Sequence, residues 1–201
     1  SYADRKGRRT GIEQGNTMAK RKGILEAADL FCGAGGTTTG AEASGRVRVV
    51  LAVNHWPTAI ESHSRNHPHT MHLCKRIEHI DPRNDRTLPK FDLLMASPEC
   101  THHSIARGGR PVDDQRRMTP FNVLDWADAC RPEWILLENV REFRDWGPLM
   151  QKRDTRGRLI ASPDGTPFMV PDPKRKGEIF KAWLGMLQSL GYQVDMQLLN
   201  A

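Results

Sequence analysis

The stretch "ADLFCGAGGTTTG" at residues 28–40 decides the fold class of this chain. The apolar run over 27–32 predicts a short buried strand. Gly33, Gly35 and Gly36 then remove side chains from a tight turn. A strand, a glycine turn and a helix, met in this order, build a nucleotide-sized pocket at the edge of an α/β sheet.

Strand-like and helical segments alternate along the rest of the chain. The threonines at 37–39 are predicted to cap a helix that starts near Ala41. This alternation predicts an α/β fold of the Rossmann-like kind, a mainly parallel sheet with helices on both faces. A proline-rich, charged segment near 151–177 predicts a long loop or an inserted hairpin. The further predicted strands are 47–53, 91–96, 134–137 and 194–199, and the further predicted helices are 58–67, 121–129 and 178–190.

Length and composition exclude several classes of protein. The 201 residues suit one domain of ordinary size. The sequence has no apolar run of ~18 residues, so no membrane contact is expected. The 4 cysteines include no CxxC pair, which excludes a zinc ribbon and a dense disulfide scaffold and favours a reducing, cytoplasmic setting.

Positive charge is concentrated at the N-terminus. The formal net charge is +6, and residues 1–23 hold seven Lys or Arg against two acidic side chains. We expect this arm to be disordered. It can touch phosphate groups of a nucleic acid, or be a solvated tail or an added remnant, with Met18 as the natural start.

Two later stretches place reactive groups at the carboxyl ends of predicted strands. "LLMASPECTHHS" at 93–104 puts Cys100 after a proline turn, and "WILLENVREF" at 134–143 puts Glu138 directly after four apolar residues. Carboxyl ends of parallel strands are where such folds hold ligands. Taken singly, Cys100 also fits a small buried apolar residue, and Glu138 also fits a helix cap or a surface charge.

The order of these three stretches resembles that of the DNA (cytosine-5)-methyltransferase family. "DLFCGAGG" is similar to the family's first motif, "SPEC" to its nucleophile motif and "ENV" to its glutamate motif. "LGYQVDMQLLNA" looks like the segment before the family's arginine motif, so the resemblance covers about 24–201. The longer phrases "ASPECTHHS" and "ENVREFRDWGPL" look like a phage-type branch. The resemblance implies S-adenosylmethionine as methyl donor and double-stranded DNA as partner, in the nucleoid of a bacterial or phage-infected cell.

The resemblance also implies roles for single residues. The Cys100 thiolate would add to carbon 6 of a flipped cytosine, so that carbon 5 can take the methyl group, while Glu138 would bridge to ring N3. Asn139 and Arg116 would complete the catalytic group. Gly108 and Gly109 would hinge a lid over DNA. The implied cofactor-binding residues are Phe31, Gly33, Gly35, Gly36, His55, Trp56, Ile77 and Pro98, with Trp56 stacked on adenine, and the implied DNA-binding residues are Ser104, Arg107 and Arg110.

The sequence departs from the family pattern at three places in the site. Glu99 replaces a proline beside Cys100, and its carboxylate would raise the pKa of the thiol. Asn54 and His55 stand where an acidic residue usually binds the ribose. Arg76, with Glu78 close by, stands where an acidic residue usually reads the adenine amine.

The chain stops at Ala201, before the family's arginine motif, target-recognition region and closing segment. We therefore expect 24–201 to be part of a catalytic domain, and the chain to be one half of a split enzyme or a fragment. The strand at 194–199 would lack a neighbour, and the strand at 134–137 would have an open edge.

Two alternative interpretations remain open. The chain can be a non-catalytic pseudo-methyltransferase that binds DNA or a partner. It can also be a metal-binding module, because a histidine-rich cluster follows the second predicted strand. The notable absence of a second ligand pair argues against a metal site, and none is expected. The cluster consists of His63, His67, His69, His72 and Cys74.

Overall fold

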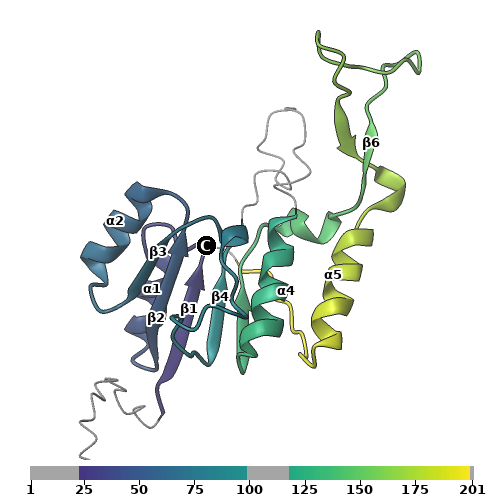
Figure 1. Ribbon diagram of the computed structural model, residues 1–201. Helices are drawn as coiled ribbons and strands as arrows, with labels where there is room; N and C mark the ends of the chain where they lie inside the picture. The colour runs from purple at the N-terminus through teal and green to yellow at the C-terminus, as the bar shows by residue number, and fades with distance from the viewer. Residues whose placement is uncertain (1–22, 99–117, 200–201) are drawn as a thin grey trace, which may run out of the picture.

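The computed structural model describes residues 23–98 and 118–199 of the chain. Its centre is a five-stranded sheet of order β3-β2-β1-β4-β5, in which every neighbouring pair is parallel (Figure 1). The predicted α/β class with a mainly parallel sheet is confirmed. The strands are β1 (Leu25–Leu30), β2 (Val47–Asn54), β3 (Met71–Cys74), β4 (Leu93–Ala96) and β5 (Trp134–Leu137).

Helices cover both faces of this sheet. α1 and α2 lie on one face and are joined by a hydrogen bond between Thr38 and His63, whereas α4 and α5 lie on the other (Figure 1). None of the described helices is long and apolar enough to cross a membrane. The helices are α1 (Gly36–Ala43), α2 (Pro57–Asn66), α4 (Thr119–Cys130) and α5 (Glu178–Ser189), with 3-10 turns η1 (Ile77–His79), η3 (Arg141–Asp145) and η4 (Pro173–Arg175).

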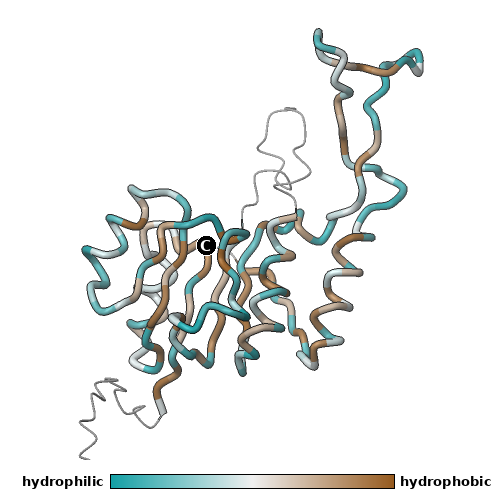
Figure 2. The backbone as a smooth tube through the Cα atoms, in the orientation of Figure 1, coloured by the Kyte–Doolittle hydropathy of each residue, from teal (hydrophilic) through white to brown (hydrophobic). Residues whose placement is uncertain are grey.

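The core follows from the alternation of side chains along the strands. In β1, Ala28 and Leu30 face the layer of α4, where Trp126 is 1% exposed, while Ala27 faces α1. The strands form the apolar centre of the molecule in Figure 2. Burial on both faces is what a parallel sheet requires.

A second apolar cluster joins α4, η3 and α5. Trp146 and Trp183 are both almost fully buried, and the rings of Phe143 and Trp146 stack with centroids 5.5 Å apart. The indole Nε1 of Trp183 donates a hydrogen bond of 3.0 Å to the carbonyl of Pro120. This cluster fixes the segment that follows β5 against the body of the protein.

The predicted start of the first helix is wrong. α1 begins at Gly36 rather than near Ala41, and its N-cap is Gly35 in the left-handed region, with φ 100°. The threonines at 37–39 lie inside the helix, and the Thr38 hydroxyl bonds to Asp29 instead of capping. The glycine ends the turn and starts the helix in one residue because it tolerates a positive φ.

The predicted strand over 194–199 is also wrong, and β3 was missed. Residues 194–199 carry no strand: Val194 packs against the cluster of α4, η3 and α5, whereas Leu198 and Leu199 are 65% and 80% exposed. A strand needs a partner for its backbone groups, and this segment pairs with none among the described residues. β3, with the sequence MHLC, pairs with β2 although it is short and not rich in β-branched residues.

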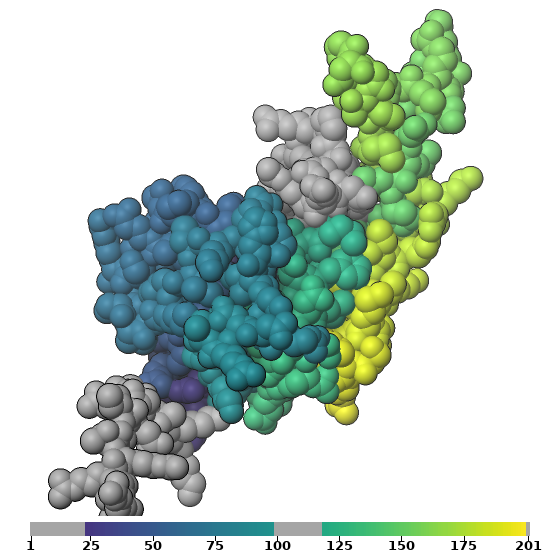
Figure 3. Space-filling model, viewed as in Figure 1, coloured from purple at the N-terminus to yellow at the C-terminus, as the bar shows by residue number. Residues whose placement is uncertain are grey.

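A hairpin leaves the body between η3 and η4. β6 (Leu149–Gln151) and β7 (Met169–Pro171) pair antiparallel, and further bridges link Arg153 to Leu159 and Ala161 to Pro167. Figure 3 shows this hairpin protruding beyond the rest of the molecule. We refer to residues 149–171 as the projecting hairpin.

Candidate active site

The carboxyl ends of four strands are tied into one row by backbone hydrogen bonds. Each of these bonds runs from the turn after one strand to the last residues of its neighbour, so the turns that carry the predicted site residues lie at one edge. The bonds are Cys32 N to Val53 O (3.2 Å), Ser97 N to Leu30 O (3.3 Å) and Glu138 N to Ala96 O (3.0 Å).

The glycine turn after β1 exposes backbone rather than side chains. Phe31, Gly33 and Gly35 all have positive φ, at 63°, 53° and 100°. A Cβ added at Gly33 or Gly36 would meet nothing within 4 Å. The N-terminus of α1 has no side-chain cap, so its first N–H groups are available to an anionic group.

The turn after β2 leaves an aromatic ring at the same edge. The Asn54 side-chain oxygen accepts a hydrogen bond of 2.9 Å from the backbone N of Trp56, which fixes the turn. His55 is exposed, and Trp56 is 59% exposed. A bare indole face can stack against a flat ligand at low entropic cost.

The turns after β4 and β5 are joined to each other. The Asn139 side-chain amide donates a hydrogen bond of 3.3 Å to the carbonyl of Pro98, and its oxygen accepts one of 2.9 Å from Val140 N. Pro98 is buried, whereas Glu138 is exposed to solvent. Glu99, Cys100, Ser104, Arg107, Arg110 and Arg116 lie outside the described residues.

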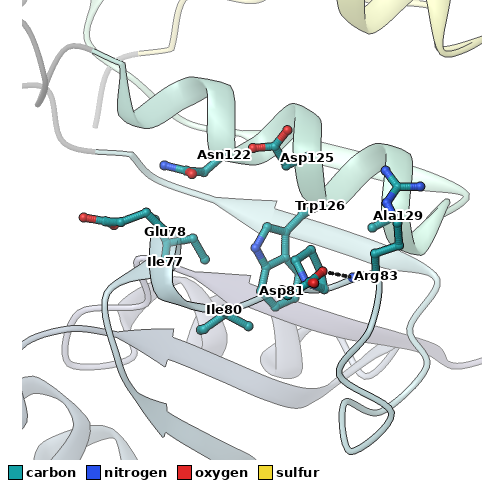
Figure 4. Close-up of a pocket in the computed structure, with 10 residues that line it drawn as sticks. Ile77, Glu78, Ile80, Asp81, Arg83, Asn122, Asp125, Trp126 and Ala129 are labelled. Carbon is teal, nitrogen blue, oxygen red and sulfur yellow. Dashed lines mark hydrogen bonds between the residues drawn. The ribbon is translucent and has the colours of Figure 1, made fainter.

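A cavity of about 330 Å³ lies between the segment after β3 and α4 (Figure 4). Ile77 lines it, and the neighbouring Glu78 forms an ion pair with Arg76, with Arg76 Nε 2.6 Å from Glu78 Oε1. Sequence reasoning named Ile77 but missed the helix residues that close the cavity. Besides Ile77 and Glu78, the lining residues are Ile80, Asp81, Pro82, Arg83, Asn122, Asp125, Trp126 and Ala129.

A buried polar network supports the glycine turn from beneath. The Thr38 hydroxyl donates a hydrogen bond of 2.7 Å to Asp29 Oδ2 and lies 3.0 Å from His63 Nε2, and His63 Nδ1 lies 2.8 Å from His72 Nε2. Burial raises the pKa of Asp29 to about 6, although the bond from Thr38 opposes the shift. Burial lowers the pKa of His63 to about 4, with His72 and His67 adding to the effect. Asp29 Oδ1 has no hydrogen-bond partner among the described residues.

The other histidines bond to protein groups as well. His67 lies 3.1 Å from both Thr39 Oγ1 and Glu42 Oε2, and His69 lies 2.8 Å from Glu42 Oε1. Within the ranges that the structure covers, no group of three or more His, Cys, Asp or Glu can hold a metal ion. His63 and His67 of the cluster lie within hydrogen-bond distance of Thr38 and Thr39 at the start of α1, and so contribute to the support of the glycine turn. The spacing of His63 and His67, one helical turn apart, was the sequence signal for a shared face.

None of the three described cysteines is well placed to act as a nucleophile. Two have a raised pKa, and the third lies on the edge strand of the sheet. Burial, with Asp29 nearby, raises the pKa of Cys32 to about 12, and burial also raises that of Cys130. Cys74 is exposed at the end of β3, the edge strand of the sheet. A thiol with a raised pKa supplies little thiolate.

The parallel order β3-β2-β1-β4-β5, with a glycine turn after β1, defines a doubly wound α/β protein with a ligand site at the carboxyl edge. The profile of the C-5 cytosine-specific DNA methylase family matches residues 25–147. The chain belongs to this family, whose methyl donor is S-adenosylmethionine.

Several bacterial Type II methyltransferases are similar to this chain in sequence. Type II methyltransferase M.HindV of Haemophilus influenzae is 29% identical over 126 residues, which is 60% of this chain and 39% of that protein. M.HgiGI of Herpetosiphon aurantiacus is 28% identical and covers 60% of this chain and 94% of that protein. M.Bsp6I of Bacillus sp. is 27% identical and covers 89% of this chain and 47% of that protein. The chain thus spans less than half of M.HindV and M.Bsp6I.

A solved structure shares the fold. A protein described as a DNA modification methyltransferase encoded within an E. coli prophage superposes with a TM-score of 0.53 at 20% identity. The match covers 82% of this chain and 38% of that protein.

The residues at the row of turns fit the family's cofactor. An uncapped helix N-terminus and open space at two glycines suit the carboxylate end of S-adenosylmethionine, and the bare Trp56 ring suits its adenine. Asn54 and His55, which the family resemblance predicts at the ribose position, carry an amide and an imidazole rather than a carboxylate.

Proposed function

We propose that this chain carries the methyl-transfer half of a DNA (cytosine-5)-methyltransferase. Residues 24–201 would be part of the catalytic domain, with an insertion near 151–177 and a basic arm at 1–23. The observation that carries the proposal is the hydrogen bond between Asn139 and Pro98. It joins the turn after β5, which carries Glu138, to the turn after β4, which precedes Cys100 in the sequence. Both turns belong to the same row as the glycine turn.

The glycine turn and Trp56 would hold the cofactor between them. Phe31, Gly33, Gly35 and Gly36 would contact its amino-acid end, and His55, Trp56, Ile77 and Pro98 its nucleoside end. When bound, S-adenosylmethionine supplies a methyl carbon attached to a sulfonium leaving group. The backbone N–H groups at the start of α1 would bind the carboxylate and fix the direction in which the methyl group points.

Cys100 would be the nucleophile. Two peptide units separate it from Pro98 along the chain and span at most ~7.6 Å, so Cys100 is within reach of the row of turns. Its thiolate would add to carbon 6 of cytosine, and carbon 5 would then take the methyl group. Loss of the proton from carbon 5 would re-form the ring double bond and expel the thiolate. The raised pKa values of Cys32 and Cys130 support Cys100 over these two.

Glu138 would hold a proton at ring N3 and so favour attack by the thiolate. Its exposure fits a group that meets a base flipped out of the duplex. Asn139 would set its direction through the bond to Pro98. Arg116 would support the thiolate, and Ser104, Arg107 and Arg110 would contact the DNA backbone.

The chain would need a further polypeptide segment, supplied in the same protein or by a second chain. β5 has a strand neighbour on one side only among the described residues. Trp134 and Leu136 are 58% and 56% exposed on the face shared with Leu93 and Met95, so this part of the face is uncovered. Exposed apolar surface beside an unpaired strand favours another strand and its covering helix.

The test is covalent capture. The chain is mixed with S-adenosylmethionine and duplex DNA containing 5-fluorocytosine, in which the fluorine cannot leave and the adduct persists. A denaturant-stable adduct that Cys100→Ser abolishes is the expected result, either from the chain alone or once the remaining segment is supplied. Cys74→Ser is the matched control, because Cys74 is an exposed cysteine at the sheet edge.

Cofactor binding is measured separately by calorimetry. Binding of S-adenosylmethionine and DNA without any adduct, with the remaining segment present, would favour the non-catalytic alternative. Failure to bind the cofactor at all would overturn the cofactor site itself.

A further inference from the structure

We infer that the projecting hairpin is a contact surface for the phosphate backbone of double-stranded DNA, with Lys152, Arg153 and Arg156 as the contacting side chains. The inference rests on the proposed function for the identity of the polyanion. It adds a surface that lies beyond the residues matched by the family profile, which end at 147.

The charge of the chain outside its N-terminal arm is concentrated in and around this hairpin. Residues 149–176 contain seven Lys or Arg and three Asp, whereas the rest of 24–201 contains sixteen Lys or Arg and nineteen Asp or Glu. Residues 149–176 therefore carry a positive net charge, whereas the rest of 24–201 carries a negative one. Such separation directs a polyanion to one region of a protein surface.

The acidic side chains of the hairpin are engaged within its turns. Asp154 accepts hydrogen bonds from the backbone N of Arg156 and of Arg158, both 2.9 Å, and pairs with the Arg158 side chain at 2.8 Å. Asp164 accepts a hydrogen bond of 3.0 Å from Thr166 N. These carboxylates therefore shape the two turns and neutralise Arg158 only.

Three cations are left for an outside partner. Lys152, Arg153 and Arg156 are exposed, and in the part of the chain that the structure describes none of them forms an ion pair. Arg153 Nη1 donates to the Gly157 carbonyl at 2.8 Å, which holds the guanidinium in place but leaves its charge.

The base of the hairpin is fixed to the body. A Cβ at Gly147 would lie 2.2 Å from the Arg175 carbonyl oxygen, so the two ends of the hairpin touch. Asp172 N donates to Pro148 O at 2.9 Å, and Phe180 N donates to Trp146 O at 3.0 Å. Trp146 itself is buried. The hairpin is thus anchored where it leaves the fold.

The hairpin rises from the edge that holds the candidate active site. Only η3 separates it from Glu138 and Asn139, and it points away from the sheet at the carboxyl end of the strands (Figure 1). Its outgoing segment, which is β6 continued to the bridge at Arg153, is ~17 Å long at ~3.3 Å per residue, which is comparable to the width of a duplex. A duplex bound over Glu138 would have the basic strand beside it.

The test measures DNA binding as a function of salt, without cofactor. A labelled duplex of about 20 base pairs is titrated with the whole chain between about 50 and about 200 mM salt. We expect Lys152→Gln/Arg153→Gln/Arg156→Gln to bind at least ~10-fold more weakly and to lower the salt slope by about 3, since each phosphate contact contributes ~0.9. The loss should be equal for duplexes of unrelated sequence.

The matched control removes three exposed charges at the opposite edge. Arg46→Gln/Arg86→Gln/Lys90→Gln alters the net charge equally, in the segments before β2 and β4, and should keep most of the affinity. The double variant Lys152→Gln/Arg156→Gln keeps the hydrogen bond between Arg153 and Gly157. It therefore tests the loss of charge even if the triple variant distorts the tip of the hairpin. An unchanged slope in this folded double variant, equal losses in the control, or equal affinity for polyglutamate would overturn the inference.

Failure of the inference and failure of the proposed function are distinguishable. A wild-type chain that binds no duplex overturns the hairpin surface. The 5-fluorocytosine adduct and the calorimetric binding of S-adenosylmethionine report on the active site and do not depend on the hairpin charges.

Discussion

Thr38 donates a hydrogen bond of 2.7 Å to Asp29, and this pair joins the helix after the glycine turn to the strand before it. Asp29 is 1% exposed and Thr38 is 0% exposed. His63 reaches the same hydroxyl from α2 at 3.0 Å. Because the threonine hydroxyl has a single proton, donation to ionised Asp29 requires His63 to donate to Thr38 through Nε2–H.

Replacement of Asp29 by Asn is expected to change how stability depends on pH. The folded pKa of about 6 lies above the ordinary value of 3.8, so the folded state binds more protons between these values. The unfolding free energy therefore loses ~3 kcal/mol from Asp29 as the pH rises from about 4 to about 7. Urea unfolding should show Asp29→Asn gaining that amount relative to wild type. A constant difference across the range would contradict the prediction.

Replacement of His63 by Gln is expected to act in the opposite direction. The folded pKa of about 4 lies below the ordinary 6.5, so the unfolded state binds more protons between them. His63 therefore adds stability as the pH rises through this window, by ~3 kcal/mol at full effect. His63→Gln should lose that rise in the same urea series. Exposed His79, replaced by Gln, serves as the control and should leave the profile unaltered.

The glycine turn offers a matched pair of substitutions. Gly35 has φ 100°, and a Cβ there would lie 3.1 Å from both His63 and His67, so Gly35→Ala should cost ~1–3 kcal/mol of unfolding free energy. At Gly36 a Cβ would meet nothing within 4 Å and φ is not positive, so Gly36→Ala should be neutral or slightly stabilising. Equal thermal midpoints for the two variants would show that the histidines do not restrict the turn.

The hydrogen bond between Asn139 and Pro98 can be tested by comparing a truncated side chain with one of the same size at position 139. Asn139→Ala removes both side-chain bonds and should cost ~1 kcal/mol of stability. Asn139→Asp keeps the acceptor for Val140 N but loses the donor to Pro98. If the Pro98 bond aligns the two turns, both variants should slow adduct formation with 5-fluorocytosine DNA, by at least ~10-fold for Ala. A normal adduct rate in Asn139→Asp would assign the bond to folding alone.

The uncovered face of β5 predicts an association effect without a stability effect. Leu136 is 56% exposed, so Leu136→Lys should change the unfolding free energy by no more than ~0.5 kcal/mol. It should nevertheless weaken binding of the remaining part of the enzyme, as seen by gel filtration of the mixture. Met186→Lys, at a 48% exposed position on α5, is the comparison and should not affect binding. Equal binding by both variants would place the interface elsewhere.

Much of the fold could be predicted because strong local patterns agree with it. The runs that became β1, β2, β4 and β5 place apolar residues on both faces, which is the pattern of a parallel sheet covered on both sides, although Trp134 and Leu136 leave part of one face of β5 exposed. β3 was missed because the four-residue run MHLC is too short and too poor in β-branched residues to indicate a strand. It becomes a strand through its pairing with β2, which the local sequence does not reveal. The segment at 194–199 has a strand pattern, but pairing decides whether a pattern becomes a strand.

The site was predictable only where its residues follow strands. Phe31, Trp56, Pro98 and Glu138 were placed at strand ends by order along the chain, and they lie there in the structure. The roles assigned to them stay predictions. The network of Asp29, Thr38 and His63 was not foreseen, because a lone aspartate in an apolar run does not reveal a hydroxyl nine residues later as its partner.

The row of bonds across the carboxyl edge is made almost entirely of main-chain atoms. Main-chain hydrogen bonds do not depend on the identity of the side chains. Residues that face the ligand can therefore be substituted while the spacing of the strand ends stays the same. Exchanges such as Asn54 for a carboxylate then alter affinity for a small molecule without altering the architecture that presents it. This separation explains how a chain can be only 20% identical to the prophage-encoded methyltransferase and still share its fold.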